Sequence, residues 1–443
     1  TKLGGMITDF EYDWKKHKIP PKQISAADPL QFMLLDAVDQ ALQDAGYQEL
    51  EFDRSRTGVI VGTVFGNEFS QHLEMGIHLP RFQRDLRTVL KRRGVAEDRI
   101  SSVCEQYEEI LLEHMPALTD ETGSFTASTL ASRITKTYDF MGGAVAIDAG
   151  EASSLAALSS SLDLLRAGDC DLMICAGGHR SLGFAQYENA TRAGKLAGAT
   201  PQAPFDADNS GRVPGEGVAV VILKRLSDAQ RDGDRVIGIV HGVAAACHQS
   251  ADESVRSAID RCVSASGIDP SNVALIEAAS SGNPHRDREE AAAIAAAYGE
   301  RRGGTPLQLG TIAGQLGDTA GAAGLLALHK AVDEIEHLEV APNVGLKTPA
   351  DYISEHSEVL QLPMAQNPLP VPSDDGSVLA GVSCLSDYQL AYHAIIERPT
   401  KVSVTQTQAA RPVKTLTPSF RTESDWRIVR LGAETFDALA ATT

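Results

Sequence analysis

Short apolar runs alternate with amphipathic segments along most of the chain, and this pattern predicts its secondary structure. Thr57–Thr63 is an apolar run next to glycines, which is typical of a fully buried strand. From Ala144 onward, strand-like and helix-like segments alternate, which favours a parallel sheet covered by helices on both faces. We expect further strands at residues 144–148, 171–176, 217–223, 236–246, 273–278, 307–311, 378–384 and 389–397. We expect helices at residues 29–45, 153–167, 253–265, 288–297 and 320–335.

The elements follow a similar order in the two halves of the chain, although no sequence repeat is visible. We therefore expect one domain over residues 1–398 that contains two pseudo-duplicated α/β lobes, about 1–234 and 235–398. Residues 399–443 begin with a stretch rich in Thr, Gln and Pro, which is typical of a linker, and then contain a short apolar run at Trp426–Leu431. We expect a linker and a short packing segment there. The chain opens on Thr1 rather than Met, and we expect it to be a piece of a longer protein.

A highly charged helical insertion is expected at about residues 79–118. Its first half is rich in arginine and its second half in glutamate. The simplest interpretation is a pair of solvated surface helices. The alternative is a docking surface for a neighbouring domain or carrier.

Composition narrows the classes of partner and location. The chain has 40 Lys and Arg residues against 59 Asp and Glu residues, a formal charge of −19, which disfavours nucleic acid and anionic membrane surfaces as partners. No apolar run reaches the ~18 residues that a membrane span needs. The cysteines have no metal-ligand spacing and most of them lie in apolar runs, so we expect mostly buried, reduced thiols in a cytoplasmic protein. We expect no metal and no cofactor. The six cysteines are Cys104, Cys170, Cys175, Cys247, Cys262 and Cys384.

The segment Ile147–Leu155 is the strongest local signal of a functional site. It predicts a strand, a tight turn and a helix start, with Glu151 at the elbow. Enzymes use this geometry to hold a nucleophile near the amide groups at a helix N-terminus. Here the elbow has a carboxylate, whose ionised form the helix dipole favours and burial opposes.

Several ordered motifs resemble those of the β-ketoacyl synthase family, which has the thiolase fold. They are Asp28-Pro-Leu-Gln, Ala45-Gly-Tyr47, Pro204-Phe-Asp-Ala207, Pro214-Gly-Glu-Gly217 and Leu223-Lys-Arg-Leu226. The likeness spans Asp28 to Glu397 and implies two lobes in a layered α-β-α-β-α architecture. It also implies a two-fold dimer.

The residues that carry this family's chemistry are replaced. Condensation needs a thiolate and two imidazoles. The resemblance implies a conserved lysine in the family's motifs as well. On the family's motifs, Glu151 stands at the cysteine, Ala279 at the first histidine, Ala313 at the lysine and Asp318 at the second histidine. The glycine-rich oxyanion loop is replaced as well, and we expect its new residues, Ser386, Tyr388 and Gln389, to resist the backbone conformations that glycine allows.

Two histidines lie near these motif positions. His285 falls in a polar loop, and we expect it to be solvated. His393 matches a family histidine without a chemical role, and we expect a structural hydrogen bond.

The resemblance therefore predicts a catalytically inactive, chain-length-factor-like subunit that pairs with an active ketosynthase and shapes its acyl tunnel. Its other partners would be an acyl carrier protein and further synthase domains. The charged insertion, Glu121–Phe125 and Phe140–Gly143 look most similar to such domains in polyunsaturated fatty-acid synthases. One alternative is a decarboxylase of malonyl-type thioesters that uses Glu151 and Asp318 as an acid and base pair. Family members with that activity keep both histidines, so Ala279 and Asp318 count against it. A third hypothesis is a scaffold that only binds an acyl carrier.

Overall fold

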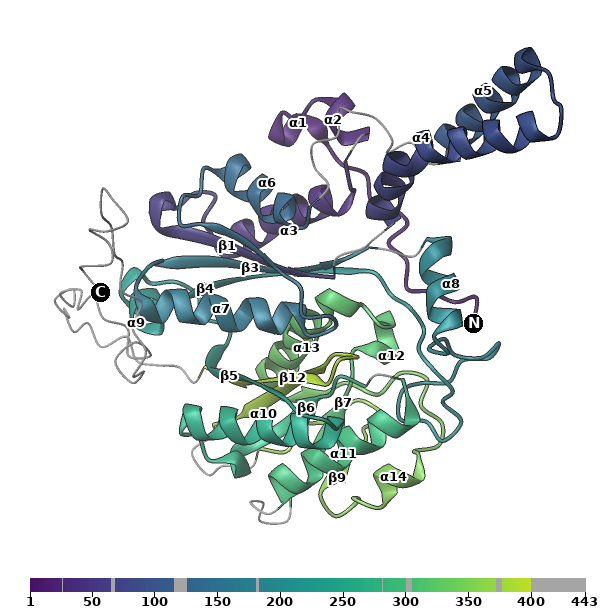
Figure 1. Ribbon diagram of the computed structural model, residues 1–443. Helices are drawn as coiled ribbons and strands as arrows, with labels where there is room; N and C mark the ends of the chain where they lie inside the picture. The colour runs from purple at the N-terminus through teal and green to yellow at the C-terminus, as the bar shows by residue number, and fades with distance from the viewer. Residues whose placement is uncertain are drawn as a thin grey trace, which may run out of the picture.

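The protein stacks two β-sheets between three layers of helices (Figure 1). The computed structural model describes residues 1–25, 27–64, 68–114, 126–180, 183–280, 282–299, 305–371 and 377–399. Helices α7 (Ser153–Ala167) and α13 (Ala323–His337) form the middle layer and contact strands of both sheets. The expected α-β-α-β-α layering is thereby confirmed.

The first sheet has four strands in the order β2-β1-β3-β4. They are β2 (Ala144–Ile147), β1 (Thr57–Thr63), β3 (Leu172–His179) and β4 (Gly217–Lys224). All seven residues of β1 are buried, as its apolar run predicts. The outer face of this sheet is covered by α3 (Leu30–Asp44) and α6 (Ser128–Tyr138).

The second sheet has six strands in the order β5-β12-β11-β6-β7-β9. In that order they are Ile239–Cys247, Leu390–Glu397, Leu379–Leu385, Val273–Glu277, Leu307–Gly310 and Leu360–Gln361. Helix α10 (Ala251–Ser266) covers the outer face, and α11 (Pro284–Gly299) packs beside α10. Strands β8 (Glu339–Val340) and β10 (Asn367–Pro368) pair separately.

Short helices complete the described chain. They are α1 (Trp14–His17), α2 (Pro21–Ser25), α8 (Phe184–Arg192), α9 (Leu226–Asp232), α12 (Ala313–Leu316) and α14 (Asp351–Ser354), with 3-10 turns at Arg54–Arg56, Pro270–Asn272 and Ala320–Ala322.

Most neighbouring strands are parallel, as the alternation of strands and helices predicts, but two strands run in the opposite direction. Strand β4 runs antiparallel to β3, and β12 runs antiparallel to both β11 and β5. Strands β11 and β12 are joined by a short loop, and a short connection pairs neighbouring strands antiparallel. The remaining neighbours in both sheets are parallel.

The charged insertion is a helical pair, as expected, but it begins earlier. Helix α4 spans Glu68–Arg92 and α5 spans Glu97–His114, so the first helix starts eleven residues before the expected boundary. The expected elements at 115–118, Glu121–Phe125 and 400–443 lie outside the described residues.

Small side chains allow the two middle helices to approach each other closely. Ser154 of α7 is fully buried, and its Oγ accepts the Leu325 N–H of α13 at 3.1 Å. A Cβ on Gly324 would lie 2.6 Å from Leu155 Cγ, a distance that side chains essentially never adopt. The serines, alanines and glycines of these helices therefore set the spacing between the sheets. Among the described residues, no helix combines the length and apolar character that crossing a membrane requires.

Candidate functional site

The predicted elbow between β2 and α7 is confirmed. Gly150 adopts φ +61°, a left-handed conformation that favours glycine, and its N–H is held by Asp148 Oδ1 at 3.0 Å. Ser153 Oγ accepts the Ala149 N–H at 2.9 Å and donates to the Gly150 carbonyl at 2.6 Å. This turn projects Glu151 at the N-terminal end of α7, where the sequence placed it.

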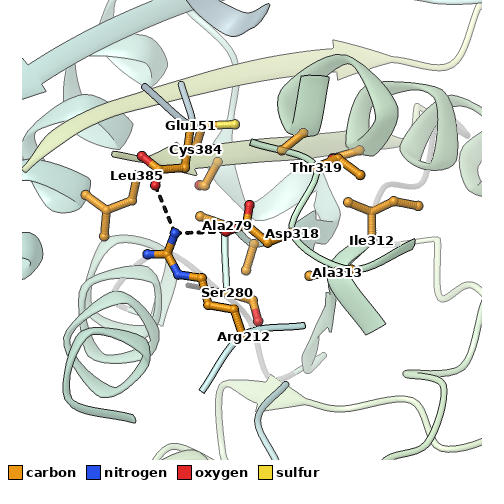
Figure 2. A pocket seen from close by; sticks show the side chains of 15 residues that line it. Glu151, Arg212, Ala279, Ser280, Ile312, Ala313, Asp318, Thr319, Cys384 and Leu385 are labelled. Carbon is orange, nitrogen blue, oxygen red and sulfur yellow. Dashed lines mark hydrogen bonds and ion pairs between the residues drawn. The ribbon is translucent and has the colours of Figure 1, made fainter. Parts of the chain in front are cut away.

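Arg212 joins the two carboxylates that the sequence singled out. Its Nη1 lies 2.9 Å from Glu151 Oε1 and 2.8 Å from Asp318 Oδ2 (Figure 2). The second carboxylate oxygen of Glu151 accepts the Asp387 N–H at 3.0 Å. Glu151 and Asp318 are therefore brought together, as expected, but through a third group that the sequence reasoning missed.

Asp387 extends this group into a larger ion-pair cluster. Its carboxylate accepts Arg212 Nη2 at 2.6 Å and Arg286 Nη1 at 2.8 Å, and it also forms an ion pair with Lys195. Three acidic and three basic side chains thus neutralise one another. The cluster unites segments that lie up to 236 positions apart in the sequence. We call these six residues the Arg212 cluster: Glu151, Lys195, Arg212, Arg286, Asp318 and Asp387.

Burial and charge act in opposite directions on the pKa values of this cluster. Burial, followed by the nearby Asp318 carboxylate, raises the pKa of Glu151, while Arg212 partly offsets the rise. Burial alone would lower the pKa of Arg212, but the surrounding carboxylates outweigh it and raise that pKa. For Asp387, burial by itself would raise the pKa, but the nearby charges of Arg212 and Lys195 outweigh it and bring this pKa well below its usual range. Charge pairing therefore maintains an ionised Arg212 in a largely buried place.

The two alanines expected at lost catalytic positions line the same cavity. Ala279 follows β6, and Ala313 begins α12; both border a cavity of about 30 Å³ together with Glu151 and Asp318 (Figure 2). Ligand pockets usually measure roughly 300–1,000 Å³. The Ala279 N–H donates to Glu290 at 2.8 Å. The cavity can hold water but no acyl chain.

The oxyanion loop differs from the expectation in one respect. Gln389 adopts the left-handed conformation with φ +65°, although we expected a non-glycine residue to resist it. Ser386 stabilises the loop, because its Oγ accepts the Tyr388 N–H at 3.3 Å and the Leu390 N–H at 3.2 Å. The Asp387 amide donates to Glu151, so it is already used inside the protein.

The histidines have separate environments. His393 is buried between Tyr298 Oη at 2.8 Å and Ser383 Oγ at 2.9 Å, and burial lowers its pKa to about 3, which confirms the structural role. His285 is exposed, as expected, but it lies in the first turn of α11 rather than in a loop. His179, at the end of β3, was not identified from the sequence, and its position at the carboxyl end of a strand is the signal that could have found it.

Two larger clefts border the Arg212 cluster. One, of about 490 Å³, is lined by Gly211, Gly282, Gly345 and Lys347. The other, of about 360 Å³, is lined by His179, Glu151 and Tyr388. Arg212 and Asp318 lie at both clefts and at the small cavity. Over the described part of the chain, no group of three or more side chains could hold a metal ion.

Comparison with known proteins agrees with this fold. The chain is 26% identical over 415 residues to one of the subunits of the polyunsaturated fatty acid synthase of Thraustochytrium sp., and the match covers 89% of this chain and 14% of that protein. It is 28% identical over 432 residues to one of the subunits of the phenolphthiocerol/phthiocerol polyketide synthase of Mycobacterium bovis, and this match covers 95% of this chain and 21% of that protein. The chain thus spans at most about a fifth of the length of these relatives.

A solved structure and two family descriptions match as well. The structure titled PfaC Keto synthase-Chain length factor superimposes with a TM-score of 0.73 at 24% identity, covering 92% of this chain and 43% of that chain, which supports a thiolase-like fold. The family description "Beta-ketoacyl synthase, N-terminal domain" matches residues 1–229, and "Beta-ketoacyl synthase, C-terminal domain" matches residues 237–347. The chain therefore belongs to the β-ketoacyl synthase family, related to the synthases of polyunsaturated fatty acids and polyketides.

Proposed function

We propose that this chain is a non-catalytic ketosynthase-like subunit or domain of the chain-length-factor type. It pairs with an active ketosynthase and shapes the acyl tunnel of a polyunsaturated fatty-acid or polyketide synthase, where an acyl carrier protein and other synthase domains are further partners. We propose a cytoplasmic location for this assembly.

The Arg212 cluster at the elbow carries the proposal. Both carboxylate oxygens of Glu151 are engaged, by Arg212 and by the Asp387 amide, and a carboxylate at this position cannot accept an acyl chain as a thioester. Ala279 and Ala313 provide methyl groups where the family has a histidine and a lysine, and no imidazole or ammonium group replaces them among the described residues that line the cavity. The elbow is therefore retained as architecture without the groups that condensation needs.

The first sheet offers a surface for pairing. Strand β2 is an edge strand that bonds within its sheet only to β1, so its other edge has free backbone donors and acceptors in the described structure. Val145 on this strand is 46% exposed, and Met141 before it is 67% exposed. An open, partly apolar edge is a site at which a second sheet can add. The two-fold dimer implied by the family resemblance gives this edge a partner ketosynthase.

Co-expression with active ketosynthases tests the pairing. We expect a stable complex with one of them, and a change in product length when residues of this chain at the tunnel are enlarged. Val145→Lys should weaken the complex, while Val89→Lys, which changes a side chain of similar exposure on helix α4, should not. Failure to bind any tested ketosynthase would count against the proposal.

The raised pKa of Glu151 favours a second candidate, a decarboxylase of malonyl-type thioesters that uses Glu151 and Asp318 as acid and base. Release of carbon dioxide from malonyl-loaded carrier protein by this chain alone would distinguish it. We expect no turnover above background. Turnover that Glu151→Gln and Asp318→Asn both abolish would establish the decarboxylase instead.

A further inference from the structure

Helices α4 and α5 form a hairpin that projects from the body of the protein (Figure 1). Among residues 74–113 of this hairpin, whose side chains the structure describes, only Leu79, Ile100 and Cys104 are buried apolar side chains. Two helices that pack only on each other leave most of their surface exposed, so the distribution of residue types around them reveals what each face can bind.

One face of the hairpin is closed by polar contacts. Gln83 of α4 donates to Glu108 of α5 at 2.8 Å. Nearer the tip, Lys91 and Arg87 lie 3.0 Å and 3.3 Å from the carboxylate of Glu97. These pairs also define the alignment of the two helices along the hairpin, with residue 83 beside residue 108 and residue 91 beside residue 97.

The opposite face is apolar and exposed. Phe82 and Val89 lie two turns apart on one side of α4, about 100° or more around the helix from Gln83 or Arg87. Tyr107 and Ile110 lie on α5, turned away from Glu108 by a similar angle. Their exposed fractions are 38%, 49%, 36% and 58%, respectively. We call Phe82, Val89, Tyr107 and Ile110 the hairpin apolar face.

The charges of the two helices are complementary. Apart from the residues that pair on the polar face, α4 has three basic residues and one acidic residue from Ile77 to Arg92, whereas α5 has four acidic residues and one basic residue. A second hairpin that stacks on the apolar face can place its α4 over either α4 or α5 of the first. Charge favours α4 over α5 of the other copy, since like charges on facing helices repel.

That choice determines the symmetry of the contact. Placing α4 over the other copy's α5 requires a two-fold axis parallel to the hairpin, which leaves the two bodies at the same end. Equivalent residues then lie at the same height along the axis, so Phe82 of one copy faces Tyr107 and Ile110 of the other. The same patch is used on both copies, as a two-fold contact demands.

We propose that the hairpin apolar face is a self-association surface on which a second copy of this chain docks its own α4–α5 hairpin, forming an antiparallel four-helix arrangement. Four partly exposed side chains per copy bury less than the roughly 1,600 Å² of a standard interface. The contact is therefore concentration-dependent and separate from the pairing edge at β2.

Cross-linking of the full chain tests both the contact and its geometry. The background is Cys247→Ser, which removes the exposed thiol. Phe82→Cys and Ile110→Cys, each in a separate protein, should give a covalent dimer with a short bismaleimide when they are mixed, and much less when either is used alone. A matched mixture of Gln83→Cys and Glu108→Cys, on the polar face, should give none. Absence of the mixed dimer, or strong cross-linking of Phe82→Cys alone, would overturn the proposed arrangement.

Sedimentation of the uncross-linked protein gives an independent readout. Val89→Asp should weaken self-association at least tenfold without changing the thermal midpoint by more than a degree or two, because Val89 is exposed. Thr88→Asp, one position along and turned by about 100°, is the control and should associate like the wild type. A wild-type chain that remains monomeric at all accessible concentrations would refute the proposal. Binding of the Val89→Asp variant to a ketosynthase is measured in a separate experiment. Self-association through the hairpin and the proposed pairing function can therefore fail independently.

Discussion

Replacement of Arg212 by leucine should destabilise the protein in a pH-dependent way. Its side chain is 14% exposed and bridges three carboxylates, of which Asp387 retains Lys195 and Arg286 after the change. Removal of one partner from a buried ion pair costs about 3–5 kcal/mol, and the remaining cations place this case near about 3 kcal/mol. Glu151 and Asp318 lose the charge that compensates their burial.

The thermal midpoint gives the measure of this loss. With an unfolding entropy of about 2.1 cal/mol/K per residue, the 371 described residues give about 0.8 kcal/mol/K. A loss of about 3 kcal/mol therefore lowers the midpoint by roughly 4 °C. Loss of Arg212 raises the pKa of Glu151 further. At lower pH Glu151 therefore takes up a proton, and the energetic cost of burying its unpaired charge disappears. The difference from wild type should therefore be larger at pH 8 than at pH 5.5.

Differential scanning calorimetry at these two pH values can check the prediction. The matched control is Arg192→Leu, which removes an exposed arginine paired with Glu188 at 2.6 Å and should change stability by less than about 1 kcal/mol. Adding Glu151→Gln to Arg212→Leu should recover part of the loss. The reasoning is refuted if Arg212→Leu falls no further than the control, or if its loss is independent of pH.

Three further changes probe buried groups by similar measurements. Burial, followed by the neighbouring Glu277, raises the pKa of Glu334 from 4.5 to about 8. Between these pH values the folded state retains a proton that the unfolded chain has lost, so stability falls as pH rises from about 4.5 to 8. Glu334→Gln should therefore flatten the dependence of the thermal midpoint on pH between pH 5 and 8, and an unchanged slope would contradict this. Tyr298→Phe removes the Oη that lies 2.8 Å from His393 Nε2 and should lower the free energy of unfolding by about 1–3 kcal/mol in urea denaturation. An unchanged free energy of unfolding would show that this hydrogen bond does not stabilise the fold. Gln389→Gly should leave the stability of the protein unchanged or raise it by up to about 1 kcal/mol, because glycine adopts φ +65° without strain. A clear loss of stability would show that the glutamine side chain is needed.

Much of the fold could be predicted because it depends on local periodicity. The apolar run at Thr57–Thr63 and the small-residue helix at Ser153–Ala167 have the predicted boundaries. The direction of each strand could not be predicted in the same way, and β4 and β12 run antiparallel to their neighbours. A strand's apolar pattern is the same in either direction, so only its neighbours in the sheet determine the pairing.

The candidate site was likewise predictable in part from the sequence. Family motifs placed Glu151, Ala279, Ala313 and Asp318 together, and all four line one cavity. The motifs gave no sign of Arg212, because no family motif marks it and its partners come from distant segments.

The exposed apolar face of the α4–α5 hairpin could not be predicted from the pattern of apolar and charged residues either. The sequence predicted a charged helical pair, and a solvated face was its simplest interpretation. Which apolar residues remain exposed depends on how the two helices face each other, and this is visible only in contacts such as that between Gln83 and Glu108.

By itself, the sequence determined the layered α/β architecture and the elbow at Glu151, and it predicted that the cysteine, lysine and histidines of the family's motifs are replaced. These depend on residue type and on spacing along the chain. Only the tertiary structure decided that Glu151, Asp318 and Asp387 share Arg212, because the charges that meet in a buried site depend on which segments the fold brings within hydrogen-bonding distance.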